Sequence, residues 1–183
     1  MKKENGFTLI EILITIVVLS ILLAAGAPAF NGFIKNNRVT TQTNGLVSAI
    51  QLARNEALKR GTNAVICASS DGATCTGNGT WASGWIVYSD IDPGDGNNPD
   101  VGTTDPVCEE NEDCIILISD GLSGGNTLIS AIDSIHYLSN GTTAPGTGTA
   151  EFELVSRDCK NNQARNISVK LQGHVVVTEA SCP

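Results

Sequence analysis

An apolar run from Phe7 to Phe30 constrains this chain more than any other feature of its sequence. As a helix, these 24 residues would be roughly 36 Å long at about 1.5 Å per residue, which is enough to cross a bilayer. Lys2 and Lys3 precede the run, and the positive-inside rule therefore keeps its start in the cytoplasm. We expect one transmembrane segment over residues 7–30, with the remainder of the chain on the far side.

A cleaved secretory signal peptide is the alternative explanation for the same run. The run is too long for the apolar part of a signal peptide, and the small residues from Ala24 to Ala29 lack the polar end that is typical of a cleavage site. The sequence therefore favours a retained helix. Because Pro28 lacks an amide donor and Gly26 and Gly32 weaken a helix, we expect a kink or a locally melted segment there.

Glu11 is unusual because it is a carboxylate inside this apolar run. A charged side chain at the centre of a bilayer costs about 2.5–3.5 kcal/mol, and such residues usually have a function. If the chain were cut between Gly6 and Phe7, a new ammonium group would lie near the depth of Glu11. The Glu11 carboxylate of a neighbouring copy would then neutralise this ammonium group.

The sequence Gly6-Phe7-Thr8-Leu9-Ile10-Glu11 closely resembles the prepilin signature of type IV pilins and type II secretion pseudopilins. The resemblance implies cleavage after Gly6 by a prepilin peptidase, N-methylation of Phe7, and assembly through the apolar helix with Glu11 meeting the amine of an adjacent subunit. The implied partners are other minor and major pilins or pseudopilins, the inner-membrane assembly platform and membrane lipid. The implied location is the inner membrane, with the head in the periplasm, and then the fibre.

Residues 31–61 are predicted to continue as an amphipathic helix. Apolar side chains recur there at helical spacing, at Leu46, Ile50, Ala53 and Ala57. Polar residues occupy the other faces, and Arg60-Gly61 is a suitable end. One side of this helix is therefore expected to pack on a sheet.

Beyond residue 61 the pattern changes to short β-branched runs bounded by turn residues. The runs are residues 64–67, 84–88 and 115–118, with weaker candidates at 134–138 and 151–155, and a closing hairpin formed by 166–171 and 175–177. Helices do not alternate with these runs, so a parallel nucleotide-binding sheet is not supported. We predict an α+β fold with a mostly antiparallel head.

Three segments of the head and of its helix resemble the GspH/FimT branch of minor pilins and pseudopilins. They are Leu52-Ala53-Arg54-Asn55-Glu56-Ala57, Cys67-Ala68-Ser69-Ser70-Asp71-Gly72 and Gly84-Trp85-Ile86-Val87. The resemblance implies a pilin-like fold with a helical stalk packed on a β-rich head. The expected organisation is a leader over 1–6, a transmembrane and polymerisation helix over 7–30, an amphipathic helix over 31–61 and a disulfide-containing head over 62–183.

All six cysteines lie beyond residue 66, and an even count in an exported chain favours disulfides over a catalytic thiol. Sequence alone does not fix how they pair. Proximity along the chain favours Cys67 with Cys75, Cys108 with Cys114, and Cys159 with Cys182.

Residues 90–113 contain nine acids and no base. Asp90, Asp92 and Asp95 are superficially similar to a calcium loop, because calcium prefers several carboxylate oxygens within one turn. However, the spacing departs from the EF-hand pattern, and no glutamate stands at the closing position. A solvated acidic surface loop is the main expectation, calcium binding is the alternative, and no other cofactor is expected.

The net charge of −8 argues against a broad phosphate-binding surface. The DNA receptor role of FimT-like proteins places a basic Gly-Arg-x-Arg-type motif near the carboxyl terminus. The corresponding stretch, Gly173-His174-Val175-Val176, lacks both arginines. Arg165, Lys170 and His174 are the remaining weak candidates for contacts with nucleic acid.

Enzymatic motifs are missing from the sequence, which has no Gly-x-Ser-x-Gly elbow, P-loop or His-Glu-x-x-His helix. Its two histidines, His136 and His174, are isolated on expected strands. The resemblance to the prepilin signature instead implies a structural minor pilin that takes part in the assembly or initiation of a type IV pilus. The alternatives are an H-type pseudopilin of a type II secretion system and a FimT-like DNA-binding minor pilin.

Overall fold

The computed structural model describes residues 6–76, 79–91, 99, 113–145 and 149–183, with only the backbone of residues 25–29. The chain divides into two compact units, Met1–Asn37 and Arg38–Pro183. One helix, α1 (Leu9–Arg60), runs through both units.

In the first unit, α1 presents an apolar surface. Every large apolar side chain from Phe7 to Leu23 is between 48% and 83% exposed. Within the part of the chain that the structure describes, none of the helices combines the length and the apolar character that a membrane crossing needs. The transmembrane segment expected over residues 7–30 therefore stays a prediction.

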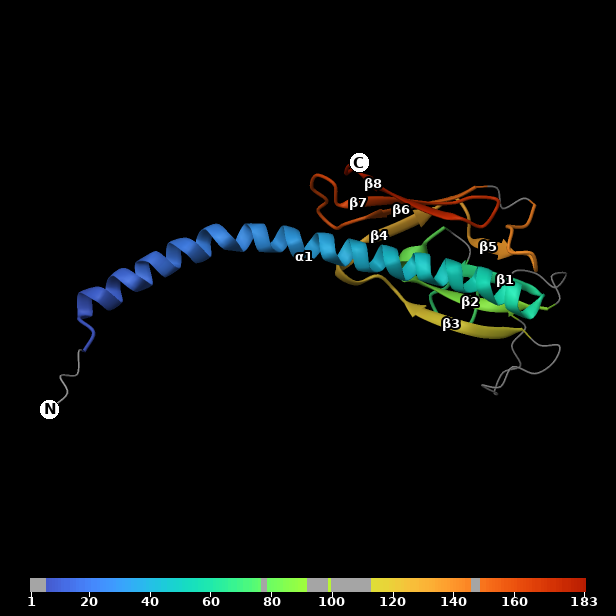
Figure 1. Cartoon of the computed structure of the whole chain (residues 1–183), viewed down its shortest axis with the longest axis horizontal. Helices are drawn as coiled ribbons and strands as arrows, with labels where there is room; N and C mark the ends of the chain where they lie inside the picture. Colours follow the sequence, from blue (N-terminus) through green and yellow to red (C-terminus); the bar gives the residue numbers. More distant parts are fainter. Residues whose placement is uncertain (1–5, 77–78, 92–98, 100–112, 146–148) are drawn as a thin grey trace. The chain divides into compact units, whose positions relative to one another are not determined.

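Of the two alternatives predicted around Gly26, Pro28 and Gly32, the locally melted segment is wrong, and the kink stays a prediction. The backbone of α1 is helical through all three residues, and Figure 1 shows the helix continuing without a break. Proline removes only one amide donor, so the neighbouring turns keep their own hydrogen bonds. The backbone therefore stays helical despite the unfavourable residues.

In the second unit, the last turns of α1 bury one side against the head. The buried apolar side chains follow helical spacing, as predicted, and are Val39, Leu46, Ala49, Ile50, Ala53 and Ala57. The helix ends at Arg60, and the next residue, Gly61, adopts a φ of +69°. This left-handed conformation suits glycine and ends the helix where the sequence indicated.

Within the described residues, eight strands follow the helix, and they form two four-stranded sheets instead of one. The first sheet has the order β3-β2-β1-β5 and consists of β1 (Asn63–Ala68), β2 (Gly84–Asp90), β3 (Cys114–Asp120) and β5 (Ser134–Tyr137). The second has the order β4-β6-β7-β8 and consists of β4 (Thr127–Ser130), β6 (Ala150–Val155), β7 (Ala164–Val169) and β8 (Val175–Ala180).

All the strand pairings in the two sheets are antiparallel, which confirms the predicted class of head. β7 and β8 form the predicted hairpin. Two short 3-10 helices, η1 (Trp81–Ser83) and η2 (Ser123–Gly125), precede β2 and β4. Figure 1 shows the two sheets and the second half of α1 together in the head.

A single apolar core joins the helix to both sheets. It contains the buried α1 residues and side chains from strands of each sheet. Trp81 of η1 is fully buried within it, and its ring lies edge-on to that of Phe152 at a centroid distance of 4.9 Å. The indole N–H of Trp81 donates to the carbonyl of Ile132 at 2.9 Å. Trp81 thus ties the 3-10 segment to the second sheet.

A second, smaller apolar cluster contains Val65, Cys67, Ile86 and Tyr88 of the first sheet. Cys67 is bonded to Cys75, eight residues later in the chain, and this disulfide holds the loop after β1 against the cluster.

The remaining disulfide-bonded cysteines lie next to the edge strands β3 and β8 of the two sheets. Cys159 is bonded to Cys182. Cys114 is also disulfide-bonded, and its predicted partner, Cys108, lies outside the described residues. Two of the three pairings favoured by proximity in the sequence are therefore present among the described residues.

Candidate functional site

The sequence Gly6 to Glu11 leads into the first turn of α1. Phe7 is 77% exposed and precedes the helix. The backbone N–H of Glu11 donates to the carbonyl of Thr8 at 3.1 Å, and the Thr8 hydroxyl lies 3.4 Å from the same N–H. Thr8 therefore caps the helix and fixes Glu11 in its first turn, where a negative charge is favourable to the helix dipole.

The Glu11 side chain is exposed and belongs to the apolar face described above. Among the described residues, no cation lies within ion-pair distance of its carboxylate. An acid in such surroundings has a strong tendency to find a cationic partner once water is excluded. The geometry therefore leaves Glu11 available for an amine from another molecule.

Of the three candidate nucleic-acid contacts, Lys170 and His174 lie opposite one another at the β7–β8 turn, and Arg165 lies apart from them. Arg165 on β7 is only 7% exposed, and it donates to the carbonyls of Asn162 and Ala164 and pairs with Glu179 at 3.5 Å. Lys170 follows the end of the same strand, about 16 Å away at about 3.3 Å per residue and on the opposite face. The arginine predicted as a phosphate contact is thus part of the internal structure of the second sheet.

His174 instead meets residues of α1 that the sequence analysis did not single out as a site. Gln51, Arg54 and Asn55 form, with the β7–β8 turn, a polar hollow of about 250 Å³. Arg54 donates its Nε–H to the carbonyl of Gly141 at 2.9 Å. A Cβ at Gly173, whose φ is +79°, would lie 2.7 Å from Arg54 Nε, so only glycine allows the turn to approach the helix this closely.

The calcium candidate is only partly described. Asp90 ends β2 and is buried, while Asp92 and Asp95 lie outside the described residues. Within the described ranges, no group of three or more His, Cys, Asp or Glu side chains could hold a metal ion.

The expectation of a solvated acidic loop is wrong at both ends of the segment. Asp90 is 3% exposed and Asp113 is 7% exposed. The pairing of Ser89 with Cys114 places both acids at the same end of the β2–β3 ladder, and Asp113 accepts the N–H of Ile91 at 3.0 Å. Both residues therefore belong to the structure of this strand end.

The other histidine, His136, is half-buried on β5. Its Nε2 lies 3.0 Å from the hydroxyl of Ser134, and burial lowers its pKa. Burial thus favours the neutral imidazole, as expected for a packed side chain.

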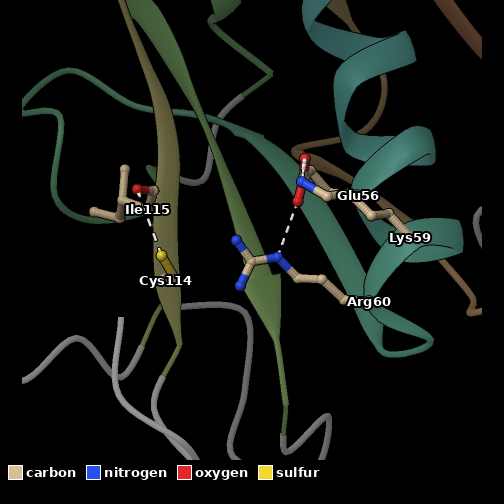
Figure 2. A network of polar contacts seen from close by, with 5 residues as sticks. All are labelled: Glu56, Lys59, Arg60, Cys114 and Ile115. Atoms are coloured by element: carbon tan, nitrogen blue, oxygen red, sulfur yellow. Dashed lines mark hydrogen bonds and ion pairs between the residues drawn. The ribbon is translucent and has the colours of Figure 1, made fainter. Parts of the chain in front are cut away.

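A polar network at the end of α1 includes Glu56, which the sequence analysis did not single out. Its side chain is 11% exposed and accepts the Nε–H of Arg60 at 2.9 Å, while the Lys59 ammonium lies at 3.5 Å. Figure 2 shows this contact, with Cys114 and Ile115 of β3 in the same view. The bond from Arg60 holds the pKa of Glu56 below its ordinary value of 4.5; burial opposes this shift, and the Lys59 charge adds to it.

Stability at low pH should therefore depend on Glu56. Because the folded-state pKa of Glu56 is depressed, its contribution is present above the ordinary value and is lost as the pH falls through the folded-state pKa. In Glu56→Gln we expect lower stability at pH 7 and a shallower loss of stability below pH 4.5. Urea titrations at a series of pH values measure both effects, and Glu151→Gln, an exposed acid on β6, is the matched control. If the free energy of unfolding falls equally steeply below pH 4.5 in Glu56→Gln and in the wild type, the expectation is contradicted.

A helix that starts next to Gly-Phe-Thr-Leu-Ile-Glu, exposes its apolar first half and packs its second half on antiparallel sheets defines a type IV pilin-like protein. Residues 42–173 match the family model of the type II transport protein GspH, and residues 1–27 match the prokaryotic N-terminal methylation motif. The chain belongs to the GspH family.

The fold is similar to crystal structures of the type IV minor pilin FimU of Pseudomonas aeruginosa. The form in space group P21 has a TM-score of 0.55 and 18% sequence identity, and covers 82% of this chain and 99% of that chain. The P65 form has a TM-score of 0.51 and 17% identity, and covers 79% of this chain and 99% of that one. At this level of identity the likeness establishes the fold alone.

A curated relative covers a shorter stretch. The type IV major alpha-pilin of Moraxella bovis is 36% identical over 70 residues, which are 38% of this chain and 43% of the relative. The chain thus matches less than half of the length of this relative.

Proposed function

We propose that this chain is a minor pilin that takes part in the assembly or initiation of a type IV pilus. The observation that carries the proposal is the first unit of the structure, where each large apolar side chain from Phe7 to Leu23 is at least 48% exposed. An apolar surface of this size is stable only against lipid or against other apolar helices. A minor pilin meets both in turn, first in the inner membrane and then in the fibre.

The maturation steps follow from the Gly6–Phe7 junction. In the proposed sequence of events, a prepilin peptidase removes residues 1–6 and Phe7 receives one methyl group on its new amine. The match of residues 1–27 to the methylation motif supports these steps. Gly6 and Phe7 lie ahead of the first helical turn, where no regular structure hinders access to the peptide bond.

The proposed partners are the prepilin peptidase, the inner-membrane assembly platform and sister pilins. The second unit, Arg38–Pro183, which contains the head, would stand in the periplasm before assembly, where its disulfides are stable. An H-type pseudopilin of a type II secretion system is the second candidate, because the GspH family model supports it as well. The third candidate, a DNA-binding minor pilin, has less support, since Arg165 is buried and paired with Glu179.

The test is the state of the chain in sheared fibres. We expect the subunit to be present in the fibre fraction with N-methylated Phe7 as its first residue, as seen by mass spectrometry. Deletion of the gene should reduce the number of surface fibres, and the intact gene supplied in trans should restore it. A chain that retains residues 1–6 in the fibre, or is missing from the fibre fraction of piliated cells, would contradict the proposal.

A further inference from the structure

The second sheet has two edges, and they differ in how they are covered. At the β4 edge, the N–H of Ser130 donates to the carbonyl of Gly79 at 3.3 Å, and Thr80 forms a bridge with Ile129. The opposite edge is β8, which pairs only with β7. Nothing in the described ranges pairs with the outer side of β8.

The hydrogen-bonding pattern identifies the groups that β8 directs outward. The N–H of Lys170 donates to the carbonyl of His174 at 2.9 Å, so in the β7–β8 ladder the even-numbered residues of β8 bond to β7. The alternation then directs the N–H and C=O groups of Val175, Val177 and Glu179 away from the sheet. These three residues form a regular row of backbone donors and acceptors.

The outer edge of β8 has few of the features that usually protect an edge strand. Such edges usually carry lysine, proline, a bulge or an inward charge, because a bare edge recruits other strands. β8 has no lysine or proline, and its register with β7 is regular. Val176 and Val177 are 45% and 43% exposed, and the charge of Glu179 is paired with Arg165. The edge is therefore regular and carries three valines, and its one charged side chain, Glu179, lies on the face that it shares with Arg165.

The disulfide between Cys159 and Cys182 keeps the end of this edge in place. Cys182 lies two residues after β8, and its N–H donates to the carbonyl of Asn161 at 3.1 Å. The strand is thus held at one end by the turn to β7 and at the other by the disulfide. Such an edge is already ordered, so a partner strand would lose little conformational entropy in β8 itself on pairing.

The geometry points to strand addition: the outer edge of β8 pairs, antiparallel, with an uncharged β-branched strand of a neighbouring subunit in the fibre. This inference rests on the proposed function. The occupant is a sister subunit and not a second copy of this chain. Antiparallel pairing of β8 with the β8 of a second copy requires a two-fold axis between the two copies. Such an axis would point the two α1 helices in opposite directions, whereas subunits enter the fibre with their helices in the same direction. Backbone bonds would hold the added strand, and its β-branched side chains would cover Val177.

The test uses Val177→Pro in the full-length chain. Proline at this position removes an outward N–H and leaves every β7–β8 hydrogen bond in place. Val176 already has the extended conformation that a following proline requires. Val177→Thr is the matched control, since it keeps the N–H and the β-branched shape, and Val177→Lys is a second variant that adds a charge to the edge.

The measurement is the amount of subunit in sheared fibres relative to the amount in membranes. We expect a decrease of about tenfold for Val177→Pro, because losing about one net backbone bond changes an association constant by about that factor. Val177→Lys should decrease it as well, and Val177→Thr should match the wild type. The melting temperature of each purified chain, compared in the same detergent, shows that the head is folded.

Normal incorporation of Val177→Pro or Val177→Lys would overturn the inference. If the wild-type subunit enters fibres and both variants do so equally well, only strand addition fails and the minor pilin role stands. If the wild-type subunit is itself missing from fibres, the proposed function fails and the inference fails with it. If Val177→Pro melts early, Val177→Lys decides the question.

Discussion

Glu11→Ala is expected to reduce the chain in fibres by more than about a hundredfold, because breaking a buried ion pair costs about 3–5 kcal/mol. Glu11 is held in the first turn of an exposed apolar helix by the cap at Thr8. In a bundle of such helices, its carboxylate and the new amine of Phe7 in a neighbouring subunit would neutralise one another. Alanine leaves that amine in apolar surroundings without a partner, so assembly becomes unfavourable.

Insertion into the membrane should not change, since alanine makes the helix more apolar. The measurement is an immunoblot of the fibre and membrane fractions from the same cells. Thr15→Ala is the matched control, because the Thr15 hydroxyl only bonds to the carbonyl of Ile12 one turn earlier. Equal amounts of Glu11→Ala and Thr15→Ala in fibres would show that Glu11 has no part in assembly.

Trp81→Ala is expected to destabilise the head by about 3–5 kcal/mol, as is typical of a buried aromatic residue. The substitution leaves a cavity beside Phe152 and removes the donor to the carbonyl of Ile132. Both effects act on the join between η1 and the second sheet. Urea unfolding of the full chain in mild detergent, followed by circular dichroism, gives the free energy of unfolding.

Two further variants separate the contributions of Trp81. Trp81→Phe keeps an aromatic ring and loses only the indole donor, so it should cost about 1–3 kcal/mol. Ile129→Ala removes an apolar side chain that is 55% exposed, and its cost should be small. If Trp81→Ala destabilises the head no more than Ile129→Ala does, Trp81 is not a core residue.

Much of the fold could be predicted because it depends on local patterns. The helix end at Arg60 follows from Gly61, and most of the strands follow from β-branched runs. The division into two sheets could not be predicted, because it depends on contacts between distant segments. β4 was missed since Thr127–Ser130 is short and half polar, and it becomes a strand only by pairing with β6.

The residues of the candidate site could also be predicted only where their role depends on local sequence. Glu11 and Phe7 stand out in the sequence because their chemistry contrasts with their neighbours. Arg165 looked available for phosphate, but the fold uses it for internal bonds and for Glu179. Arg54 was not singled out, because only the tertiary structure brings it to His174 across more than one hundred residues. Net charge and residue type alone therefore do not distinguish a free base from a structural one.

The disulfide between Cys159 and Cys182 has a consequence for the timing of maturation. It joins the segment ahead of β7 to the segment after β8, so this covalent tie exists only after both thiols are oxidised. Oxidation takes place outside the cytoplasm. A newly made subunit would therefore hold the segment after β8 by hydrogen bonds alone until it has been exported, and the covalent tie would form only in the compartment where its neighbours are assembled.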